Sequence, residues 1–323
     1  MKRSLFILIF FLISIGGFSQ DIVFSQLNNS RLDITPGFAG SFKVKDIVLN
    51  HRNFSPTGWG NYLTYRASFS QHFDAINGGV ALQFMRDDQG QGAISRSYIS
   101  GMYAYQLRLR PNMTIHPALE AKYAVYSLNT SELVFPDMFN TTSWQIDEEP
   151  ETIPRRSDHY LEFNAGFILT YENEYLRSYR DWTLGLAVRH LNKPTSLLHN
   201  QQKLNRQWSL YFDIELFLKQ LNTYQSSTLL IPTFLYSGEK GHHRFHYGTY
   251  LKYKNLRMGA FIRHNAAMDY LVPVFQLGAV FPEINLDYSY DAGFLNYKRT
   301  SFFSGAHEVT LSINLSIKES NKQ

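Results

Sequence analysis

The sequence predicts an all-β protein: a transmembrane antiparallel β-barrel of the outer-membrane type, with about fourteen strands. Three observations support this fold class. Long segments alternate apolar and polar side chains, an export signal precedes them, and 15% of the residues are aromatic. Successive side chains of a strand point to opposite faces, so each of these segments has one apolar and one polar face. In a membrane barrel these become the lipid face and the lumen face, with aromatic girdles at both boundaries.

The last predicted strand, 307–318, shows the alternation most plainly. Val309 and Leu311 lie on one face, whereas Glu308 and Thr310 lie on the other. The same pattern recurs in segments of about ten residues or more, the length that a tilted strand needs to cross a bilayer. Soluble strands are usually ~5–6 residues long, which disfavours the alternative of a large β-sandwich or propeller.

The first 19 residues have the pattern of a signal peptide. Lys2 and Arg3 supply positive charge, Leu5–Ile15 is apolar, and Ser19 ends a small-residue cleavage site. An uncleaved anchor is the alternative, but the apolar run is short against the ~20 residues of a membrane span. We therefore expect export and cleavage after Ser19.

The predicted strands follow an irregular leader and continue almost to the C-terminus. They are 42–53, 60–73, 78–87, 94–108, 113–128, 158–172, 180–191, 205–218, 226–237, 243–254, 256–265, 269–281, 283–291 and 307–318. The expected organisation is a signal peptide, 1–19; a periplasmic, plug-like leader, 20–41; the barrel, 42–318; and a short periplasmic tail, 319–323.

The connections between these strands differ in length at the two ends of the predicted barrel. Connections at one end are mostly short, for example 75–77 and 254–255, whereas the other end carries 129–157, 192–204 and 292–306. Outer-membrane barrels keep short turns in the periplasm and long loops outside the cell. This parity places both chain termini in the periplasm.

The loop 129–157 is the longest insertion and is acidic. We expect it to be exposed at the cell surface and to contact a partner, because long loops of this kind are often functional; a solvated acidic loop is the alternative. The residues expected to make the contact are Phe135, Phe139, Trp144, Asp147, Glu148 and Glu149.

The composition and local motifs indicate neither catalysis nor a cofactor. There is no cysteine, which excludes disulfides and thiolate chemistry, and the net charge of +4 is too small to indicate nucleic-acid binding. His242, His243 and His246 are best interpreted as an exposed loop end, because same-face positions in a strand lie too far apart to share a metal ion. The segment 87–92 is best interpreted as a turn, with weak calcium binding as the alternative.

Several short motifs, in order along the chain, resemble those of the PorP/SprF family of Bacteroidetes outer-membrane proteins. An F-S-Q segment is followed by a P-G-F-A-G segment, an arginine near the end of the first strand, a D-x-G hairpin, a Y-A-Y strand, an H-L-x-x-P segment, an S-Y-D segment and a final G-x-H-E segment. The matching residues are Asp21, Phe24, Ser25, Gln26, Pro36, Gly40, Arg52, Asp88, Gly90, Tyr103, Tyr105, His190, Pro194, Tyr290, Asp291, Gly305, His307 and Glu308. The chain departs from the family pattern at Ile22, Thr35, His51 and Phe54, where the family has Pro, Asn, Tyr and Trp.

This resemblance implies an accessory component of type IX protein secretion and gliding motility, located in the outer membrane of a Gram-negative, Bacteroidetes-like bacterium. It implies a scaffold or an attachment site for secreted cargo with C-terminal sorting domains. The expected partners are secretion components or such cargo, together with outer-membrane lipid, and the motif residues have a structural or partner-contact role. A transport pore for a small or hydrophobic solute is the alternative function, and a membrane-embedded hydrolase has the least support.

Overall fold

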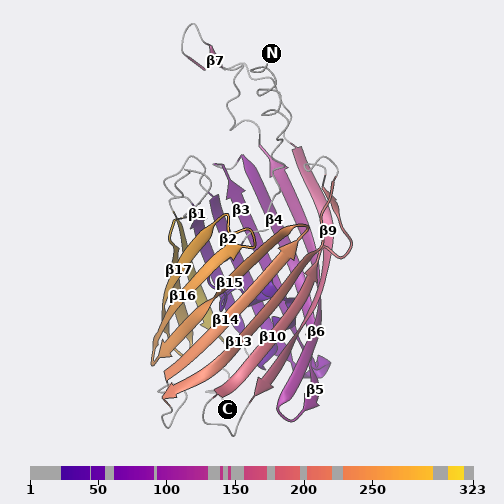
Figure 1. Cartoon of the computed structure of the whole chain (residues 1–323). Helices are drawn as coiled ribbons and strands as arrows, with labels where there is room; N and C mark the ends of the chain where they lie inside the picture. Colours follow the sequence, from indigo (N-terminus) through magenta and orange to yellow (C-terminus); the bar gives the residue numbers. More distant parts are fainter. Residues whose placement is uncertain are drawn as a thin grey trace.

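The computed structural model is a closed antiparallel β-barrel of fourteen strands (Figure 1). It describes residues 23–43, 45–54, 62–90, 93–129, 139–140, 145–146, 156–172, 179–196, 202–219, 228–293 and 305–315. Within these ranges, no helix is long and apolar enough to cross a membrane.

The barrel strands follow one another around the wall in sequence order. They are β1 (Asp46–Phe54), β2 (Tyr62–Phe73), β3 (Gly78–Gln89), β4 (Ile94–Tyr105), β5 (Leu107–Arg110), β6 (Met113–Leu128), β9 (Arg156–Glu172), β10 (Tyr179–Arg189), β13 (Gln207–Lys219), β14 (Thr228–Glu239), β15 (His242–Tyr253), β16 (Leu256–Asn265), β17 (Leu271–Val280), β18 (Ile284–Asp291) and β19 (Ala306–Asn314). β4 and β5 both pair with β6 and form one barrel strand that is interrupted at Gln106. The antiparallel pairing of β1 with β19 closes the barrel, and we call this pairing the closing seam.

The predicted fold class and strand number are confirmed, and the boundaries differ by a few residues. The first strand begins at Asp46 rather than at position 42, because Ser41–Lys43 forms a short 3-10 turn, η2. The fourth predicted strand extends to Arg110 after its interruption. The predicted end of the last strand, 316–318, lies outside the described residues. Two small hairpins, β7 (Phe139–Asn140) with β8 (Gln145–Ile146) and β11 (Thr195–Ser196) with β12 (Gln202–Lys203), stand apart from the barrel sheet.

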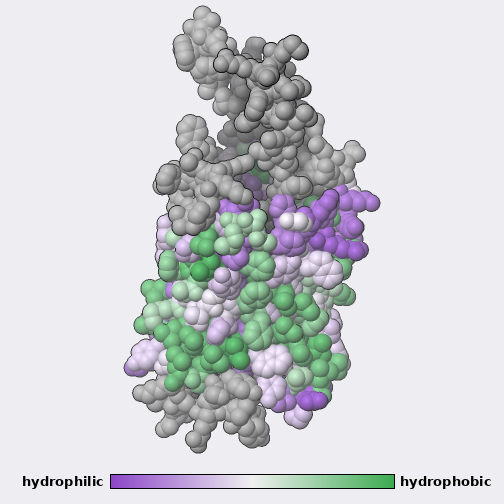
Figure 2. Space-filling model, in the orientation of Figure 1, coloured by the Kyte–Doolittle hydropathy of each residue, from purple (hydrophilic) through white to green (hydrophobic). Residues whose placement is uncertain are grey.

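The two faces of the wall differ in polarity in the predicted way. On β6, Leu119 points outward and is 66% exposed, whereas its neighbour Glu120 points into the lumen and is 5% exposed. Apolar side chains gather in a band on the outer surface (Figure 2). Because this band would face water in a soluble protein, the closed sheet with its apolar exterior excludes the sandwich and propeller alternatives.

The two ends of the barrel carry different connections. Tight turns at Asp74–Asn77, Pro111–Asn112 and Lys254–Asn255 lie at one end, which we call the short-turn end. The end of β6 and the start of β9, like the end of β18 and the start of β19, lie at the opposite end, which we call the long-connection end. Leu315 N donates to Lys45 O at 2.7 Å, which places the last described residues at the short-turn end beside the start of β1.

The core of the protein lies inside the barrel and is built around residues 23–45, which we call the leader. The leader contains α2 (Arg31–Ile34), η1 (Pro36–Phe38) and η2. It extends from Ser25, beside the long-connection half of β1, to Gly40, beside the β2–β3 turn at the short-turn end. The leader therefore passes along the lumen from the long-connection half of the barrel to the short-turn end.

Candidate functional site

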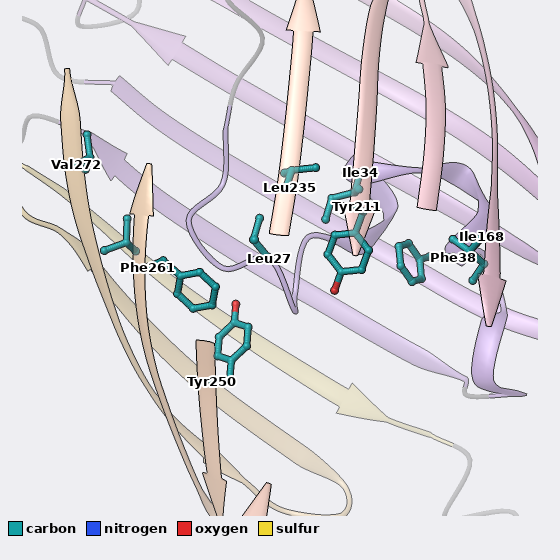
Figure 3. Packing of buried hydrophobic residues seen from close by; sticks show 10 residues of the cluster. Leu27, Ile34, Phe38, Ile168, Tyr211, Leu235, Tyr250, Phe261 and Val272 are labelled. Carbon is teal, nitrogen blue, oxygen red and sulfur yellow. The ribbon is translucent and has the colours of Figure 1, made fainter. Parts of the chain in front are cut away.

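Apolar side chains of the leader pack against the inner wall of the barrel. Leu27, Ile34 and Phe38 belong to a buried cluster whose wall members come from β9, β13, β14, β15, β16 and β17 (Figure 3). Phe38 meets Tyr211 edge-to-face, with ring centroids 5.6 Å apart. Leu27 is only 1% exposed, so the hydrophobic effect favours the docked position of the leader.

Two further apolar clusters join the leader to the opposite part of the wall. Phe24 packs in a cluster with residues of β3, β4, β6 and β9, and Ala39 packs in a cluster with residues of β3, β4 and β6. The wall members are Met85, Tyr98, Ala124 and Tyr160 around Phe24, and Ala81, Met102, Ala104 and Ala118 around Ala39. Each of the fourteen strands contributes a residue either to one of these three clusters or to a hydrogen bond with the leader that is described below.

The leader backbone touches the wall at a pair of glycines. Gly40 has φ +57°, a left-handed conformation that favours glycine. A Cβ added to Gly79 would lie 2.1 Å from Ala39 O, and one added to Gly40 would lie 2.4 Å from Gly79 Cα. No side chain fits between these two backbones, which explains why the sequence has glycine at both positions.

A buried polar network fastens the leader to the closing seam. Arg52 on β1 donates from Nη2 to Asp291 Oδ2 on β18 at 2.7 Å and from Nη1 to Glu308 Oε2 on β19 at 3.1 Å. Ser25 of the leader accepts from Arg52 Nη1 at 2.5 Å and donates from Oγ to Asp291 Oδ1 at 2.5 Å. Ser25 N also donates to Glu308 Oε2 at 2.7 Å, and Gln26 Nε2 donates to Glu308 O at 3.0 Å. We call these five residues the seam network.

Two further side chains of the wall contact the seam network. Arg263 on β16 pairs with Asp291 at 2.5 Å, and Asn50 on β1 donates to Glu308 Oε1 at 3.0 Å. Two guanidinium groups therefore face two carboxylates, and the charges balance. Because Glu308 and Asp291 are 0% and 1% exposed, these carboxylates depend on their partners for the stabilisation that water would otherwise supply.

A second polar cluster holds the middle of the leader. Asp33 accepts hydrogen bonds from Arg66, from Gln83 Nε2 at 2.7 Å and from Tyr98 OH at 3.3 Å. Arg66 also donates to a leader carbonyl, and its guanidinium lies 4.2 Å from the centroid of the Phe24 ring. These contacts tie the leader to β2, β3 and β4.

Thr35, where the chain departs from the family pattern, has a clear structural role. Its Oγ1 accepts from Gly37 N at 3.3 Å as the N-cap of η1 and donates to Leu186 O on β10 at 3.3 Å. Threonine and asparagine both cap helix N-termini, so this departure preserves the local function of the position. Pro36 follows at the first position of η1, where its missing N–H costs nothing.

His190 lies in a separate buried group on the wall. Its backbone N donates to Asn164 Oδ1 at 2.9 Å, and its Nδ1 lies 2.7 Å from Asn205 O. Asn164 in turn donates to Glu120 and Glu162, and Lys122 lies 3.3 Å from Glu162. Its side chains come from β6, from β9 and from the start of the connection after β10. Pro194 follows in the connection after β10 and is buried.

The remaining motif residues lie on the outer wall or in turns. Tyr103 and Tyr105 are exposed on β4, and Tyr103 OH donates to Ile76 O at 2.9 Å. Asp88 pairs with Arg86 on the outer face of β3, and Gly90 has φ +60° in the turn that follows. Three more motif residues lie near the end of β18 and the start of β19 but outside the seam network. Tyr290 and His307 are in ring contact, and Gly305 has φ +90° just before β19.

Some predicted residues lie outside the described part of the chain. Asp21 is one of them, and so are the acidic and aromatic residues of the loop 129–157, apart from the backbone of Phe139 in β7. Among the motif residues that the structure describes, Ser25, Gln26, Arg52, Asp291 and Glu308 come together in the seam network. Phe24, Pro36 and Gly40 lie on the same leader as Ser25 and Gln26.

The interpretation of the three-histidine cluster is wrong for one member. His242 and His243 are exposed, but His246 is 1% exposed and lies in the lumen, because β15 begins at His242 and its even-numbered side chains point inward. The described residues contain no group of three or more side chains able to hold a metal ion.

Sequence reasoning did not single out Asp33, Arg66, Asn50 and Arg263. Arg66 and Arg263 stand at positions that the strand alternation assigns to the lumen, and a charged residue there is the signal that could have drawn attention to them. Their partners were not predictable, because Asp33 belongs to an irregular segment without periodicity.

Comparison with known proteins assigns the family. The model for the family described as type IX secretion system membrane protein PorP/SprF matches residues 16–313. The chain belongs to this family. As a PorP/SprF protein with an outer-membrane-type barrel, it is a membrane component of type IX secretion.

Solved structures with a similar fold have little sequence similarity to this PorP/SprF protein. The KdgM porin is 7% identical with a TM-score of 0.39, over 83% of this chain and 98% of that chain. A triple mutant of the Rhodopseudomonas blastica porin is 6% identical with a TM-score of 0.34, over 84% and 99%. BamA from Haemophilus ducreyi lacking POTRA domains 1-3 is 9% identical with a TM-score of 0.41, over 84% and 70%. No curated protein is significantly similar to the chain.

Proposed function

We propose that this PorP/SprF protein is an outer-membrane scaffold or attachment site of type IX secretion, which engages secretion components or cargo with C-terminal sorting domains. We propose no catalytic role. The observation that carries the proposal is the leader, which occupies the lumen and is bonded to the wall on all sides.

An occupied lumen favours a role at the ends of the barrel over a role as an open channel. A solute that crosses the barrel would have to displace the leader from three apolar clusters and from the seam network. Truncation of a buried leucine such as Leu27 alone costs ~2–5 kcal/mol in other proteins. A partner that binds the barrel from outside has no such barrier.

The long-connection end is the proposed partner surface. The loop 129–157 combines aromatic side chains (Phe135, Phe139 and Trp144) with carboxylates (Asp147, Glu148 and Glu149). Aromatic residues are enriched among the anchors of protein interfaces, and charges at the rim steer association. We propose that this loop contacts the partner.

An affinity pull-down of the tagged protein from native outer membranes, analysed by mass spectrometry, tests this function. Recovery of sorting-domain cargo or secretion lipoproteins with the tagged protein supports the proposed function. If the loop 129–157 makes the contact, a Phe135→Ala, Phe139→Ala, Trp144→Ala variant should no longer recover these partners. A matched control replaces Tyr171 and Tyr253, on the outer wall at the short-turn end, by Phe. A barrel that is recovered without any partner would contradict the proposal.

A transport pore remains the second candidate because one cavity persists beside the leader. It has a volume of about 330 Å³ and is lined mainly by polar side chains of the leader and of β1, β2, β16, β18 and β19, among them Arg31, Ser68, Asn285 and Ser312. Bilayer conductance of the purified protein separates the two candidates. The scaffold proposal expects a sealed barrel, and steady ion conductance with the leader intact would favour the pore.

A further inference from the structure

Three tyrosine–histidine pairs with the same geometry lie on the outer wall. Tyr OH and His Nδ1 are 3.0 Å apart in one pair and 2.7 Å apart in the other two. The pairs are Tyr123–His159, Tyr236–His243 and Tyr288–His307, and we call them the Tyr–His pairs.

Each Tyr–His pair is built from a hairpin in the same register. The tyrosine stands on a strand that runs toward the long-connection end, and the histidine stands on the strand that returns. The residue directly opposite each histidine is two positions beyond the tyrosine: Val125 for His159, Gly238 for His243 and Tyr290 for His307. The pairs lie on β6–β9, β14–β15 and β18–β19, so they are distributed around the wall rather than clustered.

The Tyr–His pairs stand at a membrane boundary. On β9, the outward residues that follow His159 toward the middle of the wall are Leu161 and Phe163, which are 55% and 47% exposed. On β15, His243 and Tyr253 are ten positions apart, which is about 33 Å along the strand. At a strand tilt of about 40° this corresponds to ~25 Å of height, the expected apolar thickness.

Outward-facing histidines occur only at this boundary in the described part of the chain. His51 and His264 stand there as well, each in ring contact with a tyrosine, Tyr65 and Tyr247 respectively. The boundary at the short-turn end instead has tyrosine and tryptophan, for example the stacked Tyr171 and Trp182. An ordinary aromatic girdle would give both ends similar residues, so the histidines indicate a task specific to one leaflet.

The hydrogen bond in each Tyr–His pair fixes the chemistry of the imidazole. We assign the phenol hydroxyl as the donor and Nδ1 as the acceptor, and the hydrogen of the neutral ring then lies on Nε2. Among the described residues, these three Nε2 atoms have no hydrogen-bond partner. Each pair therefore offers one oriented N–H donor.

We propose that the Tyr–His pairs bind phosphate-bearing lipid head groups of the leaflet at the long-connection end. Phosphate oxygens are charged acceptors, and a hydrogen bond to a charged acceptor is roughly twice as strong as a neutral one. Three donors around the wall hold a shell of such lipids in a fixed position relative to the loops above. The lipid is thereby part of the surface that this end of the protein presents.

Lipid binding by the purified full-length protein in nanodiscs tests this proposal. The probes are a bisphosphorylated glycolipid, lipid A, and its dephosphorylated form, and native mass spectrometry measures how much of each stays bound. We expect the wild type to prefer the phosphorylated lipid by about tenfold, the ratio that one charge-assisted hydrogen bond provides. A His159→Phe, His243→Phe, His307→Phe variant should lose this preference and keep the aromatic belt.

Two companion variants separate the proposal from a merely structural role. A Tyr123→Phe, Tyr236→Phe, Tyr288→Phe variant keeps the imidazoles but loses their orientation, and it should weaken the preference only in part. Tyr171→Phe with Tyr253→Phe, at the opposite boundary, should leave it unchanged. Equal retention of both lipids by the wild type would overturn the proposal, as would displacement of lipid A by millimolar inorganic phosphate, which indicates a small-ion site.

Discussion

Replacement of Arg52 by Met tests whether the seam network holds the leader in the barrel. Methionine keeps much of the volume and removes all hydrogen bonds of the guanidinium, which is 4% exposed and bonded to Asp291, Glu308 and Ser25. Breaking a buried ion pair by removing one partner costs ~3–5 kcal/mol. Asp291 keeps Arg263, and Glu308 keeps its backbone and amide donors, so we expect the lower limit of this range.

Trypsin digestion measures this loss directly, because Arg31 and Lys43 are cleavage sites within the leader. A leader docked in the lumen is protected, and cleavage then follows the population of undocked molecules. A loss of about 3 kcal/mol raises this population roughly a hundredfold. The fragment that results from cleavage after Arg31 is identified by mass spectrometry.

Arg86→Met is the matched control for Arg52→Met. Arg86 also pairs with an aspartate, Asp88, but on the outer face of β3 with a side chain that is 55% exposed. Exposed pairs contribute about 0–1 kcal/mol, so this variant should be cleaved at nearly the wild-type rate. If Arg52→Met is also cleaved within twofold of the wild-type rate, the seam network does not hold the leader and the reasoning above is refuted.

The other contacts of the leader give three further predictions. Gly79→Ala places a Cβ 2.1 Å from Ala39 O and should destabilise leader docking by ~1–3 kcal/mol, measured by the same trypsin digestion. The control Gly101→Ala, whose Cβ would have its nearest contact at 3.8 Å, should leave docking unchanged. Equal protection of the leader in both variants would contradict the close approach of the two backbones. Asp33→Asn removes the charge that a buried arginine contacts and should cost about 2 kcal/mol in urea unfolding, and an unchanged midpoint would show that the charge is dispensable. Leu27→Ala should cost ~2–5 kcal/mol by the same measurement, and a loss below 1 kcal/mol would show that the site is not tightly packed.

The barrel was predictable from sequence because each strand carries its own signal. The alternation of Val309 and Leu311 with Glu308 and Thr310 is local, and strand number and the difference between the two ends follow from repeating that pattern. The break at Gln106 was not predictable, because the apolar residues on both sides of it continue the pattern.

The route of the leader was not predictable in the same way. Its residues have no period, and its position depends on contacts with side chains far away in sequence: Ser25 and Glu308 are 283 positions apart. The resemblance to PorP/SprF proteins identified both residues, and alternation placed Glu308 on the lumen face. Neither showed that the two meet, since a pairing of this kind is fixed only by the closed barrel.

The seam network joins the first strand, the last two strands and the leader into one unit. Arg52 and Glu308 come from the two strands that close the barrel, so their ion pair can form only when β1 and β19 are paired. Ser25 then donates to both carboxylates, and Gln26 N donates to Glu308 Oε1 at 3.4 Å. Coupling between two such events is reciprocal: the closed seam stabilises the docked leader, and the docked leader stabilises the closed seam by the same free energy. A partner that draws the leader out of the lumen therefore weakens the barrel at its seam, between β18, β19 and β1.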